Sequence, residues 1–198
     1  MWQNTQSAHI VVNILRKNRY PVIETKRLIL RKPTLKDAST YHQILSCSQV
    51  SRYSDLPHEP TEKRSARFVS WMSRLYAGGI GIGWIICIRE SSVVIGSIRI
   101  NSIEKKAQCG VLGYELHPDY WGSGYATEAL AAVVDYAHST LSLNRLEAWT
   151  SEGNDASERV LLKNGFHFEG MQREKVWVRD QFQNIKLFGR LARDKPLA

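Results

Sequence analysis

The sequence is poor in cysteine and has no paired metal-binding motif. Its three cysteines, Cys47, Cys87 and Cys109, are widely separated, and no CxxC pair or Cys/His cluster is present. A disulfide framework or a zinc site needs closely organised ligands, so we expect neither, and we expect no metal. This cysteine usage is typical of a reducing compartment, which predicts a cytoplasmic protein.

Long apolar runs, internal repeats and low-complexity linkers are also missing. The apolar stretches are too short to cross a bilayer, and the first residues lack the basic-then-apolar order of a secretion signal. No membrane partner is therefore expected. Hydrophobic residues still make up 43% of the 198 positions, which predicts one folded domain with its own core rather than bulk disorder.

Acidic residues are fewer than basic ones. The chain has 27 Lys and Arg against 19 Asp and Glu, a formal net charge of +8. This surplus favours anionic partners such as phosphates, nucleic acid or acidic proteins without choosing among them. The basic residues are scattered rather than gathered in a stripe, which argues against direct nucleic-acid binding.

Hydrophobic periodicity predicts a domain in which helices and strands alternate. The expected helices cover residues 5–18, 34–44, 61–77, 125–139 and 155–164. The expected strands cover residues 27–31, 83–89, 93–103, 109–116, 146–150, 166–178 and 185–191. This order of elements indicates a mixed α/β or α+β domain.

The sharpest local signal is a glycine turn, Trp121-Gly-Ser-Gly-Tyr-Ala-Thr-Glu128, between a predicted strand and a predicted helix. Gly122 and Gly124 let the backbone turn tightly and direct several N–H groups to one point, beside the positive end of a helix dipole. A diphosphate suits such a turn. The spacing fits neither GxGxxG, because position 127 is Thr, nor a Walker loop. A bare GxG remains compatible with a simple connection.

The residues around this turn carry a resemblance to a known family. Gly113-Tyr-Glu-Leu-His-Pro-Asp-Tyr-Trp-Gly-Ser-Gly-Tyr-Ala-Thr-Glu-Ala129 is similar to the acetyl-CoA motif of the GNAT acetyltransferase superfamily. More narrowly, it resembles the RimJ/RimL type, which includes acetyltransferases of ribosomal-protein N-termini. Further matches stand in the family's order at Glu24-Thr-Lys-Arg-Leu-Ile-Leu-Arg31, Asn154, Ser157, Asn164-Gly-Phe166 and Glu169-Gly170. The resemblance covers residues 22–192, leaving 1–21 as an N-terminal extension and 193–198 as a tail.

The resemblance implies an α+β fold with a twisted, mostly antiparallel sheet flanked by helices. The fourth strand, about 109–117, and the fifth, about 146–151, would splay apart around acetyl-CoA. The implied cofactor contacts are Leu116, Trp121, Gly122, Ser123, Gly124, Tyr125, Ala126 and Asn154. In this scheme the turn's backbone N–H groups hold the pyrophosphate, while Leu116 and Asn154 hold the pantetheine arm. Trp121 replaces the Gln or Arg common in the family, which removes a side-chain contact but keeps the backbone donors.

The implied reaction is direct transfer of an acetyl group from acetyl-CoA to an amine. It needs a neutral amine, donors for the developing oxyanion and a proton source for the thiolate. Ser157 matches the family position that faces the CoA sulfur, although a plain first-turn serine behind an Asn154 N-cap is the alternative. Glu115 is the candidate base, with a solvent-facing strand carboxylate as the equal alternative. Some relatives carry an acid where this chain has Val176. Glu174 lies nearby, but the sequence does not fix the strand register and so does not tell which face Glu174 is on.

The acceptor is the least determined part. Arg52 and Tyr53, with His58, lie in a loop where the family gathers acceptor contacts, although composition alone indicates an ordinary polar loop. At pH 7 an α-amino group is roughly one-seventh neutral, whereas a lysine amine is neutral about once in 2,500. We therefore expect a peptide or protein N-terminus, such as that of a ribosomal protein. The alternatives are a small amine (an antibiotic or polyamine) or a non-catalytic acyl-CoA- or RNA-binding module. A homodimer would be in keeping with similar proteins.

Overall fold

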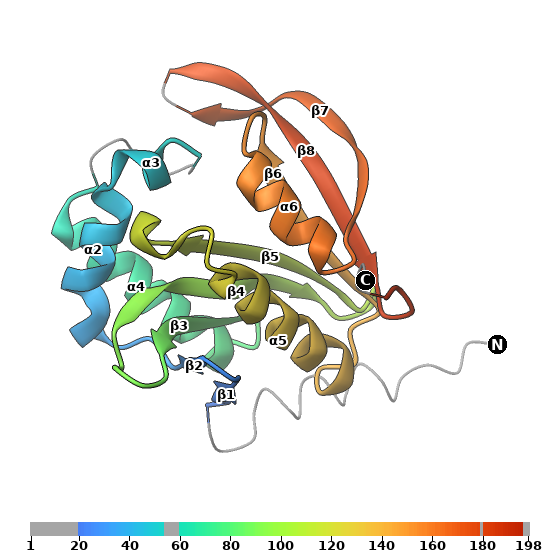
Figure 1. Cartoon of the computed structure of the whole chain (residues 1–198). Helices are drawn as coiled ribbons and strands as arrows, with labels where there is room; N and C mark the ends of the chain where they lie inside the picture. Colours follow the sequence, from blue (N-terminus) through green and yellow to red (C-terminus); the bar gives the residue numbers. More distant parts are fainter. Residues whose placement is uncertain (1–19, 54–59, 179, 196–198) are drawn as a thin grey trace.

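A twisted sheet of eight strands forms the centre of the protein, seen here in a computed structural model that describes residues 20–53, 60–178 and 180–195 (Figure 1). The strands are β1 (Ile23–Glu24), β2 (Leu28–Arg31), β3 (Ile82–Ile88), β4 (Val94–Glu104), β5 (Cys109–Leu116), β6 (Arg145–Ser151), β7 (His167–Val178) and β8 (Gln181–Leu191). The helices are η1 (Leu35–Asp37), α2 (Ala38–Ser46), α3 (Ser48–Ser51), α4 (Glu62–Ala77), η2 (Pro118–Tyr120), α5 (Tyr125–Ser139) and α6 (Asp155–Lys163).

Strand alternation divides the core between the two faces of the sheet. In β3, Trp84 belongs to the larger buried cluster, together with Leu130 of α5. The next residue, Ile85, belongs to a second cluster with Met72 of α4. Because successive side chains of a strand point to opposite faces, α5 covers one face and α2 with α4 covers the other.

The strand order is β1-β2-β3-β4-β5-β6-β8-β7, and β5–β6 is the parallel pair. These two strands pair only at Cys109↔Arg145, Gly110↔Leu146 and Val111↔Glu147. Beyond Val111 they separate, as Figure 1 shows. The predicted sheet with splayed fourth and fifth strands is thus confirmed, with β5 and β6 as those strands because the two-residue β1 precedes the predicted set.

Most predicted elements are present, with differences at their ends. The helix expected from Thr34 begins as the 3-10 turn η1, closed by a capping box between Thr34 and Asp37, and α2 follows. The expected final strand begins four residues earlier, at Gln181, because β8 pairs along β7 from the hairpin turn onward. The helix expected over 5–18 lies outside the described residues. Within the described part, no helix is long and apolar enough to span a bilayer.

Candidate active site

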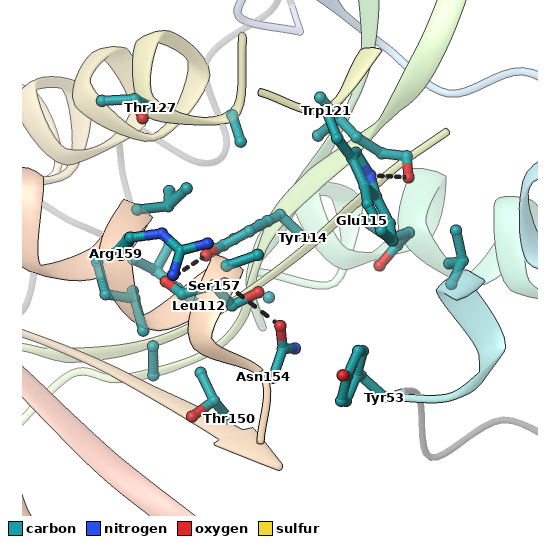
Figure 2. Close-up of a pocket in the computed structure, with 18 of the residues that line it drawn as sticks. Tyr53, Leu112, Tyr114, Glu115, Trp121, Thr127, Thr150, Asn154, Ser157 and Arg159 are labelled. Carbon is teal, nitrogen blue, oxygen red and sulfur yellow. Dashed lines mark hydrogen bonds between the residues drawn. The ribbon is translucent and has the colours of Figure 1, made fainter. Parts of the chain in front are cut away.

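A cavity of about 380 Å³ opens where β5 and β6 separate (Figure 2). Most of its wall comes from β5, the end of β6, the glycine turn with the start of α5, and α6, and residues of α2, α3 and β4 contribute the rest. Tyr53, which follows α3, also lines it. The fold therefore brings the glycine turn beside the start of α6, where Asn154 lies 30 residues after Gly124.

The glycine turn adopts the backbone that its sequence predicts. Gly122 and Gly124 have φ of +73° and +79°, and Gly124 is the N-cap of α5. This cap makes no side-chain hydrogen bond, so the first N–H groups of α5 have no capping side chain. Gly122, Gly124, Tyr125 and Ala126 line the cavity, whereas Ser123 is not part of its wall. The turn thus offers backbone donors and a helix N-terminus to an anion.

Arg27 of the β1–β2 turn holds this glycine turn in place. Its Nη1 donates to the Ser123 carbonyl at 2.9 Å, and its Nε pairs with Glu128 Oε2 at 2.6 Å. Its guanidinium also lies 4.4 Å from the ring centroid of Tyr125. Burial opposes ionisation of Glu128, but hydrogen bonds from Thr25 and Arg27 outweigh it and lower the pKa of this carboxyl. The sequence places Arg27 in a motif without indicating this contact.

Leu116 presents its backbone to the gap between the strands. The His117 N–H donates to Ile95 of β4, so the alternation of an antiparallel ladder points the Leu116 N–H and C=O away from β4. The Leu116 carbonyl accepts a hydrogen bond from Trp121 Nε1 at 2.9 Å (Figure 2). Trp121 therefore uses one acceptor site of the Leu116 carbonyl, and the Leu116 N–H is a donor that faces the gap.

The start of α6 forms the opposite wall. Asn154 is the N-cap, and its Oδ1 accepts from the Ser157 N–H at 3.3 Å, as the helix-cap alternative predicts. Both residues nevertheless line the cavity. Tyr114 OH donates to the Ser157 carbonyl at 3.2 Å and so ties β5 to α6 across the gap (Figure 2). Burial raises the pKa of Tyr114 to about 12, which keeps this phenol a neutral donor.

Glu115 is a buried member of a polar network, and the solvent-facing alternative is wrong. Its carboxylate accepts from Ser97 Oγ at 2.5 Å and from Arg99 Nη1 at 2.7 and 2.8 Å. Tyr41 OH lies 3.1 Å from Ser97 Oγ. Only 14% of the Glu115 side chain is exposed, yet it lines the cavity. Burial raises the pKa of Glu115 to about 8, while the Arg99 guanidinium favours the charged form.

A second cavity of about 510 Å³ adjoins the first. Tyr53 and Ser151 line both cavities, whereas Arg52 lines only the second; His58 lies outside the described residues. Glu174 also faces the second cavity, from a bulge in β7 where its φ is +52° and its N–H donates to Asn184 Oδ1 at 2.9 Å. The two residues therefore differ in position: Glu174 lines the second cavity, whereas Val176 pairs with Gln183 and lines neither cavity.

Within the described part of the chain, no group of three or more His, Cys, Asp or Glu side chains is arranged to hold a metal ion. Separately, the cavity wall presents the hydroxyl of Ser157, the carboxyl of Glu115 and the backbone of the glycine turn and β5, which are groups that can donate or accept hydrogen bonds.

Comparisons with known proteins agree with this geometry. Residues 27–167 match the family model described as an acetyltransferase (GNAT) domain. An uncharacterized N-acetyltransferase, YoaA of Bacillus subtilis (strain 168), is 35% identical over 158 residues, covering 80% of this chain and 89% of that protein. The ribosomal-protein-serine acetyltransferase of Escherichia coli (strain K12) is 27% identical over 111 residues, covering 56% of this chain and 62% of that one. An acetyltransferase structure (GNAT family) from Bacillus anthracis shares the fold, with a TM-score of 0.77 and 23% identity over 88% of this chain and all (100%) of that one.

Proposed function

This chain belongs to the GNAT acetyltransferase family, and from that premise we propose that it moves the acetyl group of acetyl-CoA to the α-amino group of a peptide or protein N-terminus. One observation carries the proposal. A single cavity joins the glycine turn, which offers backbone donors to an anion, to Ser157 and Glu115, two groups that can donate or accept a proton.

The residues present suit acetyl-CoA, which would supply the acetyl group as a thioester. Gly122, Gly124, Tyr125 and Ala126 offer N–H groups to the pyrophosphate, since the left-handed glycines and the uncapped helix start direct them to one place. Ser123 does not line the cavity; in this proposal it supports the turn, because its carbonyl accepts a hydrogen bond from Arg27. The backbone of Leu116 and the side chain of Asn154 face the arm from the two walls.

In the transfer step, a C–N bond forms while the C–S bond breaks. We assign Glu115 to accept the proton that the attacking amine loses, directly or through a water. The Leu116 N–H donates to the thioester oxygen as charge develops there. The Ser157 hydroxyl donates to the departing sulfur, which leaves as a thiol or a hydrogen-bonded thiolate.

The second cavity gives the acceptor a place to lie. Because Tyr53 and Ser151 line both cavities, an extended peptide in the second cavity would bring its first residue to the transfer site. Arg52 would contact the acceptor from the second cavity only. The E. coli relative is named a ribosomal-protein-serine acetyltransferase, which supports a ribosomal-protein acceptor.

Saturating acetyl-CoA should stabilise the protein. A ligand that binds only the folded state adds about 2.7 kcal/mol at about 100 times its dissociation constant. For a chain of this size we expect a rise of roughly 5–10 °C in the melting temperature. NADH and ATP, which lack the pantetheine arm, should do much less. An unchanged melting temperature at millimolar acetyl-CoA would contradict cofactor binding.

The enzyme should prefer an α-amino group to a lysine side chain. At pH 7 the neutral fractions of the two amines differ by roughly 350-fold, so a single carboxylate base favours the more acidic amine. We expect a peptide with a blocked lysine to be acetylated at least about 100-fold faster than the same peptide with a blocked N-terminus. CoA release and the product mass measure both rates. A tenfold preference for the lysine-only peptide would overturn the assignment, and faster turnover of spermidine than of either peptide would indicate a small-amine acceptor.

A further inference from the structure

Thr150 of β6 is a buried polar residue that the proposed mechanism does not use. The residue is only 4% exposed, and it lies in the wall of the main cavity (Figure 2). Its Oγ1 is buried and has no hydrogen-bond partner among the described residues. A hydroxyl in that condition calls for a physical explanation.

An unpaired buried hydroxyl disfavours the folded protein, because the group loses its hydrogen bonds to water and gains none in return. Valine has nearly the same shape, is equally β-branched and would pack in this strand without that loss. A ligand group in the cavity that accepts a hydrogen bond from the Thr150 hydroxyl would remove this penalty.

The position of Thr150 indicates which part of a ligand would reach it. The parallel register Val111↔Glu147, extended by three residues, places Thr150 across the gap from Tyr114. Ala148, two residues earlier on the same face of β6, also lines the cavity. Thr150 thus lies in the cavity wall between the last paired residues of β5 and β6 and the start of α6. This part of the gap suits an extended ligand segment that carries amide groups, such as the pantetheine arm.

We propose that the Thr150 hydroxyl donates a hydrogen bond to an amide carbonyl of the pantetheine arm of CoA. The inference rests on the proposed function, since it needs CoA in the gap between β5 and β6. It assigns to β6 a side-chain contact that complements the backbone contact from Leu116 on β5. It also predicts that removing the hydroxyl stabilises the ligand-free protein but weakens the binding of CoA.

The test compares Thr150→Val, Thr150→Ser and the exposed control Thr140→Val, each measured with and without ligand. Thr150→Val should raise the melting temperature of the ligand-free protein by about 2–4 °C, because an unpaired buried hydroxyl is removed. The same change should weaken CoA and acetyl-CoA binding by about 5–10-fold, the usual effect of one hydrogen bond. Thr150→Ser should keep the affinity within about twofold, since the hydroxyl remains.

Adenosine 3′,5′-bisphosphate, which lacks the arm, separates this contact from a general change in the site. Its affinity should be the same in wild type and in Thr150→Val. Equal loss for all three ligands, no loss for CoA, or a lower melting temperature of the ligand-free variant would each overturn the assignment, the last because it would show an existing partner. If CoA binds wild type not at all, the proposed function fails instead, which keeps the two failures distinct.

Discussion

Replacing Glu115 by glutamine should lower kcat for acetyl transfer by about 10²-fold or more, in the range expected for loss of a general base. The carboxylate lies in the cavity wall, and burial raises its pKa to about 8, close to the pH at which a base works best. Glutamine keeps the shape, and its single amide oxygen can still accept the hydrogen bonds that Ser97 and Arg99 donate to Oε1. Steady-state rates of CoA release measure the effect, with Glu90→Gln, in the exposed β3–β4 turn, as the matched control.

The pH profile tells a base from a structural carboxylate. In wild type, activity should rise with pH through about 8 as Glu115 loses its proton, and this limb should be missing in Glu115→Gln. An α-amino group titrates in the same range, so the profile should be measured with two peptides whose α-amino pKa values differ. The rise in activity that comes from the amine should then shift in pH with the pKa of the peptide, whereas the rise that comes from Glu115 should stay at the same pH. A lower rate with an unchanged profile would make Glu115 a structural residue.

Stability should also depend on Glu115, with a definite sign. The folded-state pKa is raised above the unfolded value of about 4.3, so between about pH 4.3 and about pH 8 the folded protein holds a proton that the unfolded chain has released. The contribution of this carboxyl to stability is fully present below about pH 4.3 and is lost as pH rises through about 8. In thermal unfolding, Glu115→Gln should lack this component of the pH dependence.

Replacing Ser157 by alanine should lower turnover by about 10²-fold with little change in acetyl-CoA affinity. The hydroxyl is assigned to the departing sulfur, an interaction that strengthens only as the C–S bond breaks. The hydrogen bonds that hold this part of α6 use the Ser157 backbone, through Asn154 Oδ1 and Tyr114 OH, and alanine keeps both. The defect should therefore appear in kcat with the fold intact.

The matched control for this variant is Ser39→Ala, an exposed first-turn serine of α2 that lies outside the cavity. It should leave turnover unchanged. If Ser157→Ala also leaves turnover unchanged when chemistry is rate-limiting, Ser157 serves only as a helix residue, as its local sequence alone would suggest.

The sequence by itself determined the features that depend on neighbours along the chain. Gly122 and Gly124 adopt positive φ because the turn from β5 into α5 requires it, and Gly165 ends α6 in the same way, at φ +76°. Asn154 caps α6 because its side chain needs only the N–H three residues on. These choices involve a few consecutive residues, so they could be predicted together with the family resemblance.

The tertiary structure alone decided which distant residues meet. Arg27 reaches Glu128 over 101 positions, and Glu115 lies against Ser97 and Arg99 only because β4 and β5 pair in one register. The bulge in β7 turned Glu174 to the second cavity, and the place of β8 between β6 and β7 has no local signature. Thr150 reads as an ordinary strand residue until the separation of β5 and β6 leaves its hydroxyl buried at a cavity wall. Register and packing depend on the whole core, because a shift of one residue would turn every side chain of a strand to the opposite face.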